Sequence, residues 1–101
     1  MTALLHPAKF HPGRCTGTPA AIRAIADAGQ EPSDFIDRHV QGDWGEDCAG
    51  DGRLNDGSLI DGSRIISAYR TLLGERIWII TDAADENGHR PLTTVLLPTE
   101  Y

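Results

Sequence analysis

Four residues near the middle of the chain have types and spacing that could support chemistry. Arg38, His39, Asp43 and Trp44 lie within seven consecutive residues. A histidine near a carboxylate can act as a general base oriented by an acid. The same residues also suit a structural role, in which His39 caps the carboxyl end of a helix and Asp43 bonds the amides of the turn that follows. We interpret the four residues as a candidate interaction patch and assign no catalytic residue.

Trp44 stands out in this patch because a glycine lies on each side of its short segment, Gly42-Asp-Trp-Gly45. The glycines allow the backbone to turn sharply around the ring. The ring could anchor the loop on the core, or it could contact a partner, because tryptophan and arginine are enriched in binding hot spots. We expect a ring that is mostly buried, with Arg38 and Asp43 at the accessible rim.

Two cysteines and two histidines could on paper be assembled into a tetrahedral metal site: Cys15, Cys48, His39 and His89. No two of them have the local spacing of a zinc motif, so we predict neither a metal site nor a cofactor. The cysteines are far apart in a chain of cytosolic character, and we expect both to be free thiols.

The elements that would position these residues are clearest in the carboxyl-terminal part. Three runs rich in β-branched and aromatic residues, at 64–71, 75–82 and 92–97, are separated by turns that contain Gly74 and Asn87-Gly88. This pattern is typical of an antiparallel meander. The run Arg76–Asp82 is apolar on both of its alternating faces, so we expect it to be the central strand.

The first part of the chain predicts a strand and then a helix. A short edge strand is expected at Phe10–Thr16, where Pro12 disfavours a central position. Thr18-Pro19 is a strong helix start, with threonine as N-cap and proline at the first helical position, and the helix runs to Ala28.

A second helix is expected from about Glu31 to Gln41, with Gly42 as its stop. A third is expected over Asp51–Gly62, although the repeated Asp-Gly pairs there also fit a loop. Helices before a meander predict a single α+β domain over residues 10–101, with the N-terminal helices packed on one face of an antiparallel sheet, after a loose lead-in at 1–9. The apolar face of the second helix comprises Phe35, Ile36, Val40 and, by position, His39.

Charge is unevenly distributed along the chain, whose formal net charge is −6 at pH 7. The segment from Asp27 to Asp61 holds ten carboxylates against two arginines, a net −8, which leaves +2 for the remainder. An acidic middle disfavours direct nucleic-acid binding, which needs clustered Lys and Arg. No apolar run approaches the ~20 residues of a membrane span and no secretion signal is present, so we expect a cytoplasmic protein with no membrane partner.

Several segments together resemble a known group of proteins: Arg38-His39, Gly42-Asp-Trp-Gly45, and the residues at 67–71, 76–81 and 93–101. They look like a family of small proteobacterial proteins labelled hypothetical or plasmid-related, which are commonly carried on plasmids and integrated mobile elements. The resemblance covers most of the chain from about Phe10 onward. It implies a genetic setting and no mechanism. The chain departs from the family pattern in the glycine-rich stretch at 51–62 and in the turn at 82–90.

A second resemblance lies in the element order, which is similar to that of small metal-independent ribonuclease toxins of the RelE kind or barnase-like enzymes. Toxins of the RelE kind use basic residues and a tyrosine on the sheet, and here the candidates would be Tyr69, Arg70 and Arg76. They also need a basic surface, whereas this chain has a pI near 5.0.

Our first hypothesis is therefore a small cytosolic accessory protein of a mobile element that acts by binding another protein. The ribonuclease is the alternative.

Overall fold

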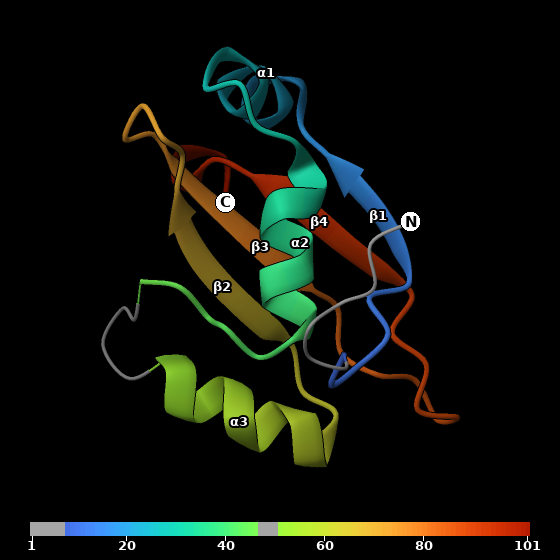
Figure 1. Cartoon of the computed structure of the whole chain (residues 1–101). Coiled ribbons are helices and arrows are strands. Elements are labelled where there is room, and N and C mark those ends of the chain that lie inside the picture. The colour runs from blue at the N-terminus through green and yellow to red at the C-terminus, as the bar shows by residue number, and fades with distance from the viewer. Residues whose placement is uncertain (1–7, 47–50) are drawn as a thin grey trace.

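The computed structural model describes residues 8–46 and 51–101, which form one four-stranded sheet with helices on one face and along one edge (Figure 1). The strand order across the sheet is β1-β4-β3-β2. This arrangement confirms the predicted α+β class. Along the chain the elements are β1 (Arg14–Gly17), α1 (Pro19–Asp27), α2 (Pro32–Val40), α3 (Asp51–Asp61), β2 (Ile65–Arg70), β3 (Arg76–Thr81), β4 (Leu92–Leu96) and the 3-10 helix η1 (Pro98–Glu100).

The carboxyl-terminal meander is confirmed, because β2 pairs antiparallel with β3, and β3 pairs antiparallel with β4. The predicted central strand is β3, which has a neighbour on each side. Ile77 and Ile79 face the helices and are fully buried in the main core. Trp78 and Ile80 alternate with them and face the opposite side of the sheet. On that side Ile80 is buried and Trp78 is half-buried, so apolar residues of β3 are removed from solvent on both faces.

The first strand corrects the prediction in two respects. It is an edge strand as expected, but β1 runs parallel to β4, so the sheet is mixed and not wholly antiparallel. It also begins at Arg14 and not at Phe10. Gly13 has a φ of 69°, and a Cβ there would lie 2.1 Å from the carbonyl oxygen of Arg90. The chain therefore turns at Gly13, and extended pairing starts only after that turn.

Helices α1 and α2 cover one face of the sheet; α1 begins at the predicted Thr18 cap, and α2 begins after Glu31, close to its predicted start. The Thr18 hydroxyl accepts the Ala21 N–H at 3.2 Å, and the Asp34 carboxylate accepts the Glu31 N–H at 2.8 Å. These bonds satisfy amides that the first helical turn leaves without partners. The core between the helices and the sheet comprises Ala21, Ile25, Phe35, Tyr69, Ile77, Ile79 and Val95.

The third predicted helix is confirmed as α3, which lies beside β2. The Asn55 side chain bonds the β2 edge, because its Nδ2 donates to the Ile66 carbonyl at 2.6 Å and its Oδ1 accepts the Ile66 N–H at 3.0 Å. Ala68 lies two residues further along this edge. Its N–H donates to the Trp44 carbonyl at 3.1 Å, and its carbonyl accepts the Glu46 N–H at 2.6 Å. The chain itself therefore occupies these edge positions, which are the ones another strand would pair with.

Two further predictions concern segments at the limits of the described residues. The lead-in expected at 1–9 is already held at its end, because the Lys9 N–H donates to the Val40 carbonyl at 2.7 Å, whereas residues 1–7 lie outside the described part. Cys15 is an exposed free thiol, and Cys48 lies outside the described residues, so the state of the second cysteine stays a prediction. No described helix has both the length and the apolar character needed to span a membrane.

Candidate functional site

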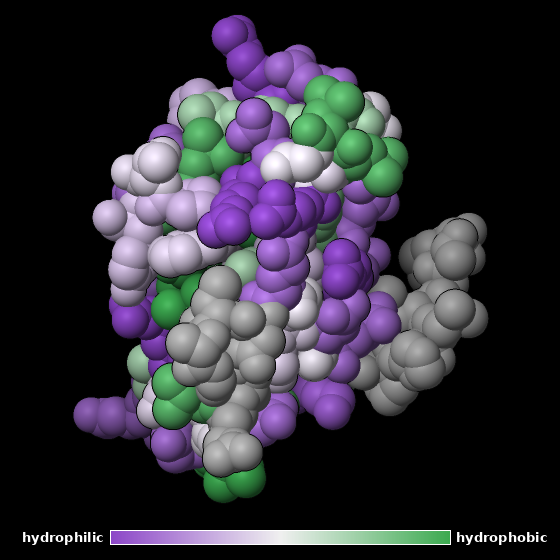
Figure 2. Space-filling model, turned by 90° about the vertical axis from the view of Figure 1, so that its left-hand side faces the viewer, coloured by the Kyte–Doolittle hydropathy of each residue, from purple (hydrophilic) through white to green (hydrophobic). Residues whose placement is uncertain are grey.

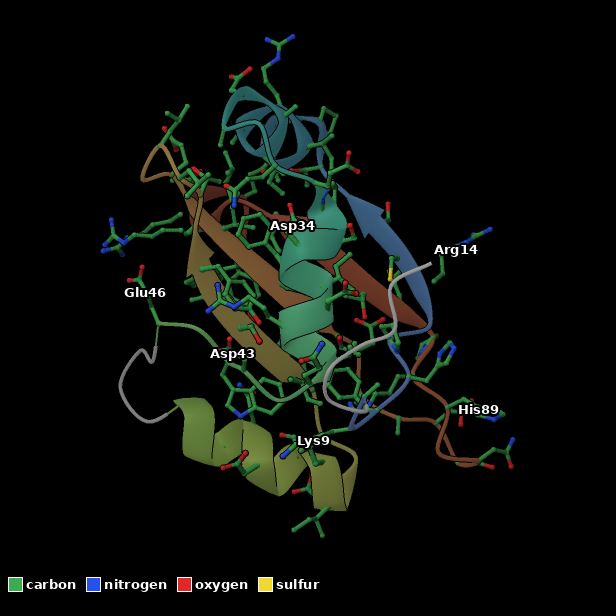
Figure 3. The ribbon with its side chains drawn as sticks, viewed as in Figure 1. Lys9, Arg14, Asp34, Asp43, Glu46 and His89 are labelled. Atoms are coloured by element: carbon green, nitrogen blue, oxygen red, sulfur yellow. The ribbon has the colours of Figure 1, made fainter. Side chains whose placement is uncertain are left out.

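Arg38 and Asp43 form a surface ion pair. Arg38 Nε donates to Asp43 Oδ2 at 2.7 Å, and the two side chains are 46% and 51% exposed. This hydrogen bond holds the pKa of the Asp43 carboxyl below its ordinary value. A pair with this much exposure contributes little to stability. Asp43 and Glu46 lie on the β2 side of the molecule (Figure 3), where the surface is mostly hydrophilic and the hydrophobic residues in view form separate patches (Figure 2).

The loop that follows α2 is fixed tightly against β2. Asp43 Oδ1 accepts the Gly45 N–H at 3.1 Å, which is the turn-bonding role predicted for this aspartate. The Tyr69 hydroxyl donates to the Asp43 carbonyl at 2.6 Å. Gly45 has a φ of 76°, and a Cβ there would lie 2.0 Å from the Ala68 carbonyl oxygen. Only glycine permits this approach, so the Gly-Asp-Trp-Gly segment acts as a structural clasp.

Trp44 is half-buried within the clasp and joins it to α3. Its ring stacks on Phe10 with a centroid distance of 6.4 Å and meets the edge of His39 at 5.9 Å. Its Nε1 donates to Asp56 Oδ1 at 3.1 Å. Both the anchoring role and the indole hydrogen bond are thus provided within the chain, which favours the anchor over the contact role.

His39 belongs to a chain of polar side chains that crosses the buried face of the sheet. Its Nδ1 bonds the Ser67 hydroxyl, and its Nε2 bonds the Thr81 hydroxyl at 2.8 Å. Thr81 bonds the Thr93 hydroxyl at 2.7 Å, and Thr93 donates to the Pro12 carbonyl at 2.6 Å. The four side chains are almost completely buried. The chain links α2, β2, β3, β4 and the segment before β1.

The donor and the acceptor of each hydrogen bond in this series of side chains follow from its last member, the Pro12 carbonyl. The Pro12 carbonyl can only accept, so the Thr93 hydroxyl donates to it and must accept from Thr81. Thr81 has then used its own proton and accepts from His39 Nε2–H. A neutral imidazole has one donor and one acceptor, so His39 Nδ1 accepts from the Ser67 hydroxyl. Each buried polar atom is satisfied by a neutral His39 with its proton on Nε2.

This environment corrects both roles considered for His39. The helix cap is Gln41, and the His39 ring instead points from the apolar face of α2 into the core with 0% of the residue exposed. Burial, followed by the nearby charge of Arg90, lowers the pKa of His39 from 6.5 to about 3. A general base must reach the proton that it removes, and this imidazole faces only its own protein partners. The Ser67–His39 contact is therefore a structural hydrogen bond.

The structure does not bring the ribonuclease candidates together. Tyr69 is 2% exposed and lies in the core beneath α2, and burial raises the pKa of its hydroxyl. Arg70 and Arg76 are exposed and lie on the opposite face of the sheet. The residues considered as metal ligands are also dispersed, because Cys15 is on β1, His39 is in the core and His89 is in the β3–β4 loop. Within the described part of the chain, no three potential ligands gather to hold a metal ion.

The sheet face opposite α1 and α2 is the second place where chemistry-bearing residues gather. We call it the open face, because neither α1 nor α2 covers it; the C-terminal segment packs on Trp78, and residues of α3 lie beside Ile66. Tyr101 meets the edge of Trp78 with a centroid distance of 5.4 Å, and the Arg64 guanidinium lies 5.6 Å from the centre of the Tyr101 ring. By strand register, the open face includes Ile66, Ala68, Arg70, Arg76, Trp78, Ile80, Leu92, Thr94, Leu96 and, on β1, Arg14 and Thr16.

Arg70 and Arg76 are direct cross-strand neighbours on the open face. In an antiparallel ladder, pairs with backbone hydrogen bonds alternate with pairs that have none. The Thr71 N–H donates to the Glu75 carbonyl at 2.9 Å, so the adjacent pair, Arg70 and Arg76, has no backbone hydrogen bonds between its members. Side chains approach most closely in such pairs, and like charges placed directly opposite one another are destabilising. The Glu46 carboxylate pairs with Arg70, whereas no described carboxylate forms an ion pair with Arg76.

The arginine pair borders a hollow at the end of the open face. Its volume is about 480 Å³, and η1 forms the opposite wall. Glu75 is the one carboxylate that lines it among the described residues, and it makes no ion pair with either arginine. Beyond the pair, the next cross-strand row is apolar and consists of Ala68, Trp78 and Leu96. Leu96 is buried and Trp78 is half-buried, so the open face offers two guanidinium groups next to the partly accessible ring of Trp78.

Sequence reasoning missed the polar partners of His39 and the cross-strand pairing of Arg70 with Arg76. Ser67, Thr81 and Thr93 occupy core-facing positions of their strands. The signal that could have found them is the combination of polar residues at such positions with a histidine on the apolar face of a helix. The cross-strand pairing of Arg70 with Arg76 follows once the turn between β2 and β3 is placed at residues 71–75.

No family model matches the chain, and neither the curated proteins nor the solved structures provide a match.

Proposed function

We propose that the protein acts by binding another protein, and that the open face of the sheet makes the contact. The observation that carries this proposal is the Arg70–Arg76 pair, which places two like charges directly opposite one another with only one carboxylate partner. Such a pair costs folding free energy, roughly 0.2–1 kcal/mol. A carboxylate supplied by a partner would remove that cost and would gain charge-assisted hydrogen bonds from both guanidinium groups.

The composition of the open face favours a protein partner over a nucleic acid. The half-buried ring of Trp78 lies in the next cross-strand row beside the arginines, and tryptophan and arginine are enriched at the centres of protein interfaces. The whole chain carries a net charge of −6, which repels a polyanion at long range but acts less on a partner that offers one or two carboxylates. The proposed contact is an acidic and apolar segment of a partner protein.

The setting of this function is also part of the proposal. We place the protein in the cytoplasm and regard it as an accessory protein of a mobile genetic element. The second statement is supported by the resemblance of its segments to plasmid-related proteins.

The test compares two charge reversals. Arg76→Glu changes the open face, and Arg23→Glu changes an exposed arginine of α1 on the other side of the molecule. Wild type and both variants, each checked for folding by thermal melting, would be crosslinked in host lysate and the captured proteins identified by mass spectrometry. We expect at least one partner that wild type and Arg23→Glu both capture and that Arg76→Glu loses.

The same variants separate binding from stability. Arg76→Glu gives Arg70 a second carboxylate neighbour, so the free energy of unfolding should stay constant or rise by up to about 1 kcal/mol while binding is lost. Identical sets of captured proteins from a folded Arg76→Glu and from wild type would contradict the proposal.

A further inference from the structure

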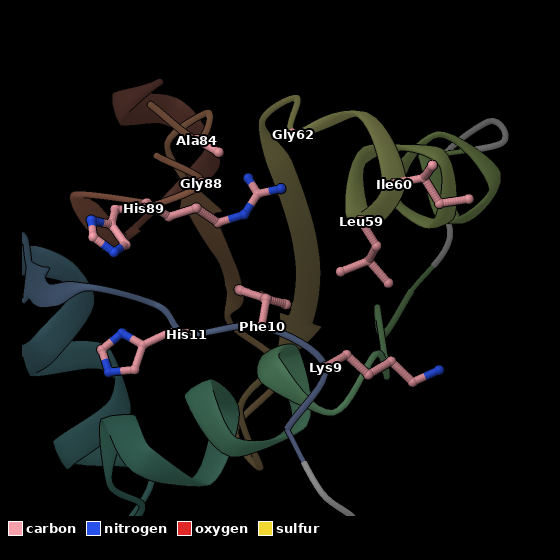
Figure 4. A pocket seen from close by; sticks show the side chains of 10 residues that line it. Lys9, Phe10, His11, Leu59, Ile60, Gly62, Ala84, Gly88 and His89 are labelled. Atoms are coloured by element: carbon pink, nitrogen blue, oxygen red, sulfur yellow. The ribbon is translucent and has the colours of Figure 1, made fainter. Parts of the chain in front are cut away.

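A second hollow, separate from the open face, gathers cationic groups and contains no carboxylate among its lining residues. It has a volume of about 660 Å³ and lies between the segment before β1, the end of α3 and the β3–β4 loop (Figure 4). Its size is within the range of pockets that hold small molecules. The lining residues with a charged or titratable side chain are Lys9, His11, His89 and Arg90.

Arg90 is the central group of this pocket. The residue is only 9% exposed, and its guanidinium donates to three backbone carbonyls: Nη1 to Ser63 at 2.7 Å and to Asp82 at 3.1 Å, and Nη2 to Ser58 at 2.9 Å. Two of the five N–H groups remain, one on Nε and one on Nη2. The three acceptors carry no net charge, and no described carboxylate forms an ion pair with Arg90. The charge of Asp61 acts on Arg90 without forming an ion pair with it. A largely buried positive charge with no carboxylate in direct contact favours an anion beside it.

The surrounding groups agree with an anionic ligand. His11 Nδ1 accepts the Gly13 N–H at 3.0 Å, so the ring carries its proton on Nε2 and offers it as a donor. The imidazoles of His11 and His89 lie on the same side of the pocket (Figure 4). Two exposed carboxylates lie close to these groups: Asp61 at the end of α3 accepts the Ser63 N–H at 2.8 Å, and Asp85 accepts the His89 N–H at 2.9 Å. Neither of them lines the pocket.

The remaining wall is apolar. Phe10 lies beneath Arg90, with the guanidinium carbon 5.7 Å from the centre of the ring. Leu59 is half-buried and extends toward Phe10 across the pocket (Figure 4). We propose that this pocket binds a small organic anion, whose carboxylate or phosphate group lies beside Arg90 within reach of His11 and His89, and whose apolar body packs on Phe10 and Leu59.

Calorimetric titration of the full chain with four probes tests this proposal. Phenyl phosphate and benzoate carry both an anionic head and an apolar ring, inorganic phosphate carries only the head, and benzyl alcohol carries only the ring. We expect at least one of the two ring-bearing anions to bind with a Kd of about 1 mM or tighter, and the tighter of them identifies the head group. Inorganic phosphate and benzyl alcohol should each bind at least about tenfold more weakly, which corresponds to 1.4 kcal/mol.

The matched variants are the double substitution His11→Gln/His89→Gln in the pocket and Arg23→Gln on α1. The double variant should bind the preferred anion about tenfold more weakly or worse, whereas Arg23→Gln should bind it as wild type does. Arg90→Lys should also weaken binding, and because Arg90 holds three carbonyls, the histidine variant decides if the lysine variant does not fold. The proposal is wrong if neither ring-bearing anion binds, if inorganic phosphate or benzyl alcohol binds as tightly as they do, or if the folded double variant binds as wild type.

Discussion

The buried histidine gives this protein a specific dependence of stability on pH. The pKa of His39 is about 3 in the folded state, against 6.5 for an exposed histidine. The folded value is the lower one, so between these two pH values the unfolded chain binds a proton that the folded chain does not. The free energy of unfolding is therefore highest above about pH 6.5 and falls as the pH is lowered toward 3. Burial of the ring is the main cause of this loss.

The expected magnitude follows from the size of the pKa shift. Each pH unit within this window changes the free energy of unfolding by about 1.4 kcal/mol. From pH 7 to pH 5, the single site should cost about 2 kcal/mol, since the change begins only near pH 6.5. The interval stays above the range in which carboxylates usually titrate, so His39 should dominate it.

Urea unfolding followed by tryptophan fluorescence at pH 7 and pH 5 measures this difference. His39→Gln retains one acceptor and one donor for Ser67 and Thr81 but cannot be protonated, so it should lower stability at pH 7 and remove most of the loss at pH 5. His89→Gln is the control, because His89 is exposed and should leave the 2 kcal/mol loss unchanged. An equal loss between pH 7 and pH 5 in wild type and His39→Gln would refute the reasoning.

Three further predictions test the fold and the clasp. Ile79→Ala should lower the free energy of unfolding by about 2–5 kcal/mol, because Ile79 is fully buried in the central strand, and a loss below about 0.5 kcal/mol in urea would contradict its position. Trp44→Ala should cost about 3 kcal/mol, whereas Arg38→Ala should cost less than about 1 kcal/mol, and similar melting temperatures for the two variants would reject the clasp. Alkylation without reductant should add two adducts, on Cys15 and Cys48, and a monomer without adducts would show a disulfide.

Much of the fold could be predicted because local signals and tertiary packing agree. Thr18-Pro19 begins α1 where its capping chemistry indicates, and the apolar run of β3 is central because both of its faces require cover. The position and direction of β1 could not be predicted in the same way. Its start depends on the approach of Gly13 to the Arg90 carbonyl, and its parallel pairing joins two segments at opposite ends of the sequence.

The candidate site was predicted less completely, for a related reason. The clasp is local in sequence, so Asp43 and the flanking glycines could be assigned turn-forming roles from composition. The environment of His39 is formed by three strands that follow it by 28 residues or more, and a single sequence does not show that it will be buried against Ser67 and Thr81. A histidine on the apolar face of a helix was visible, but its partners were not.

The charge of the chain shows most clearly why totals along a sequence do not describe a surface. A net −6 and an acidic middle argue against any cationic surface, yet Arg70 and Arg76 meet across two strands on the open face. The two polar arrangements of this sheet differ in one physical respect. From Ser67 through His39 to Pro12, every proton has an acceptor within the chain, so nothing further needs to bind. The arginine pair has one carboxylate for two cations, and a partner can supply the second.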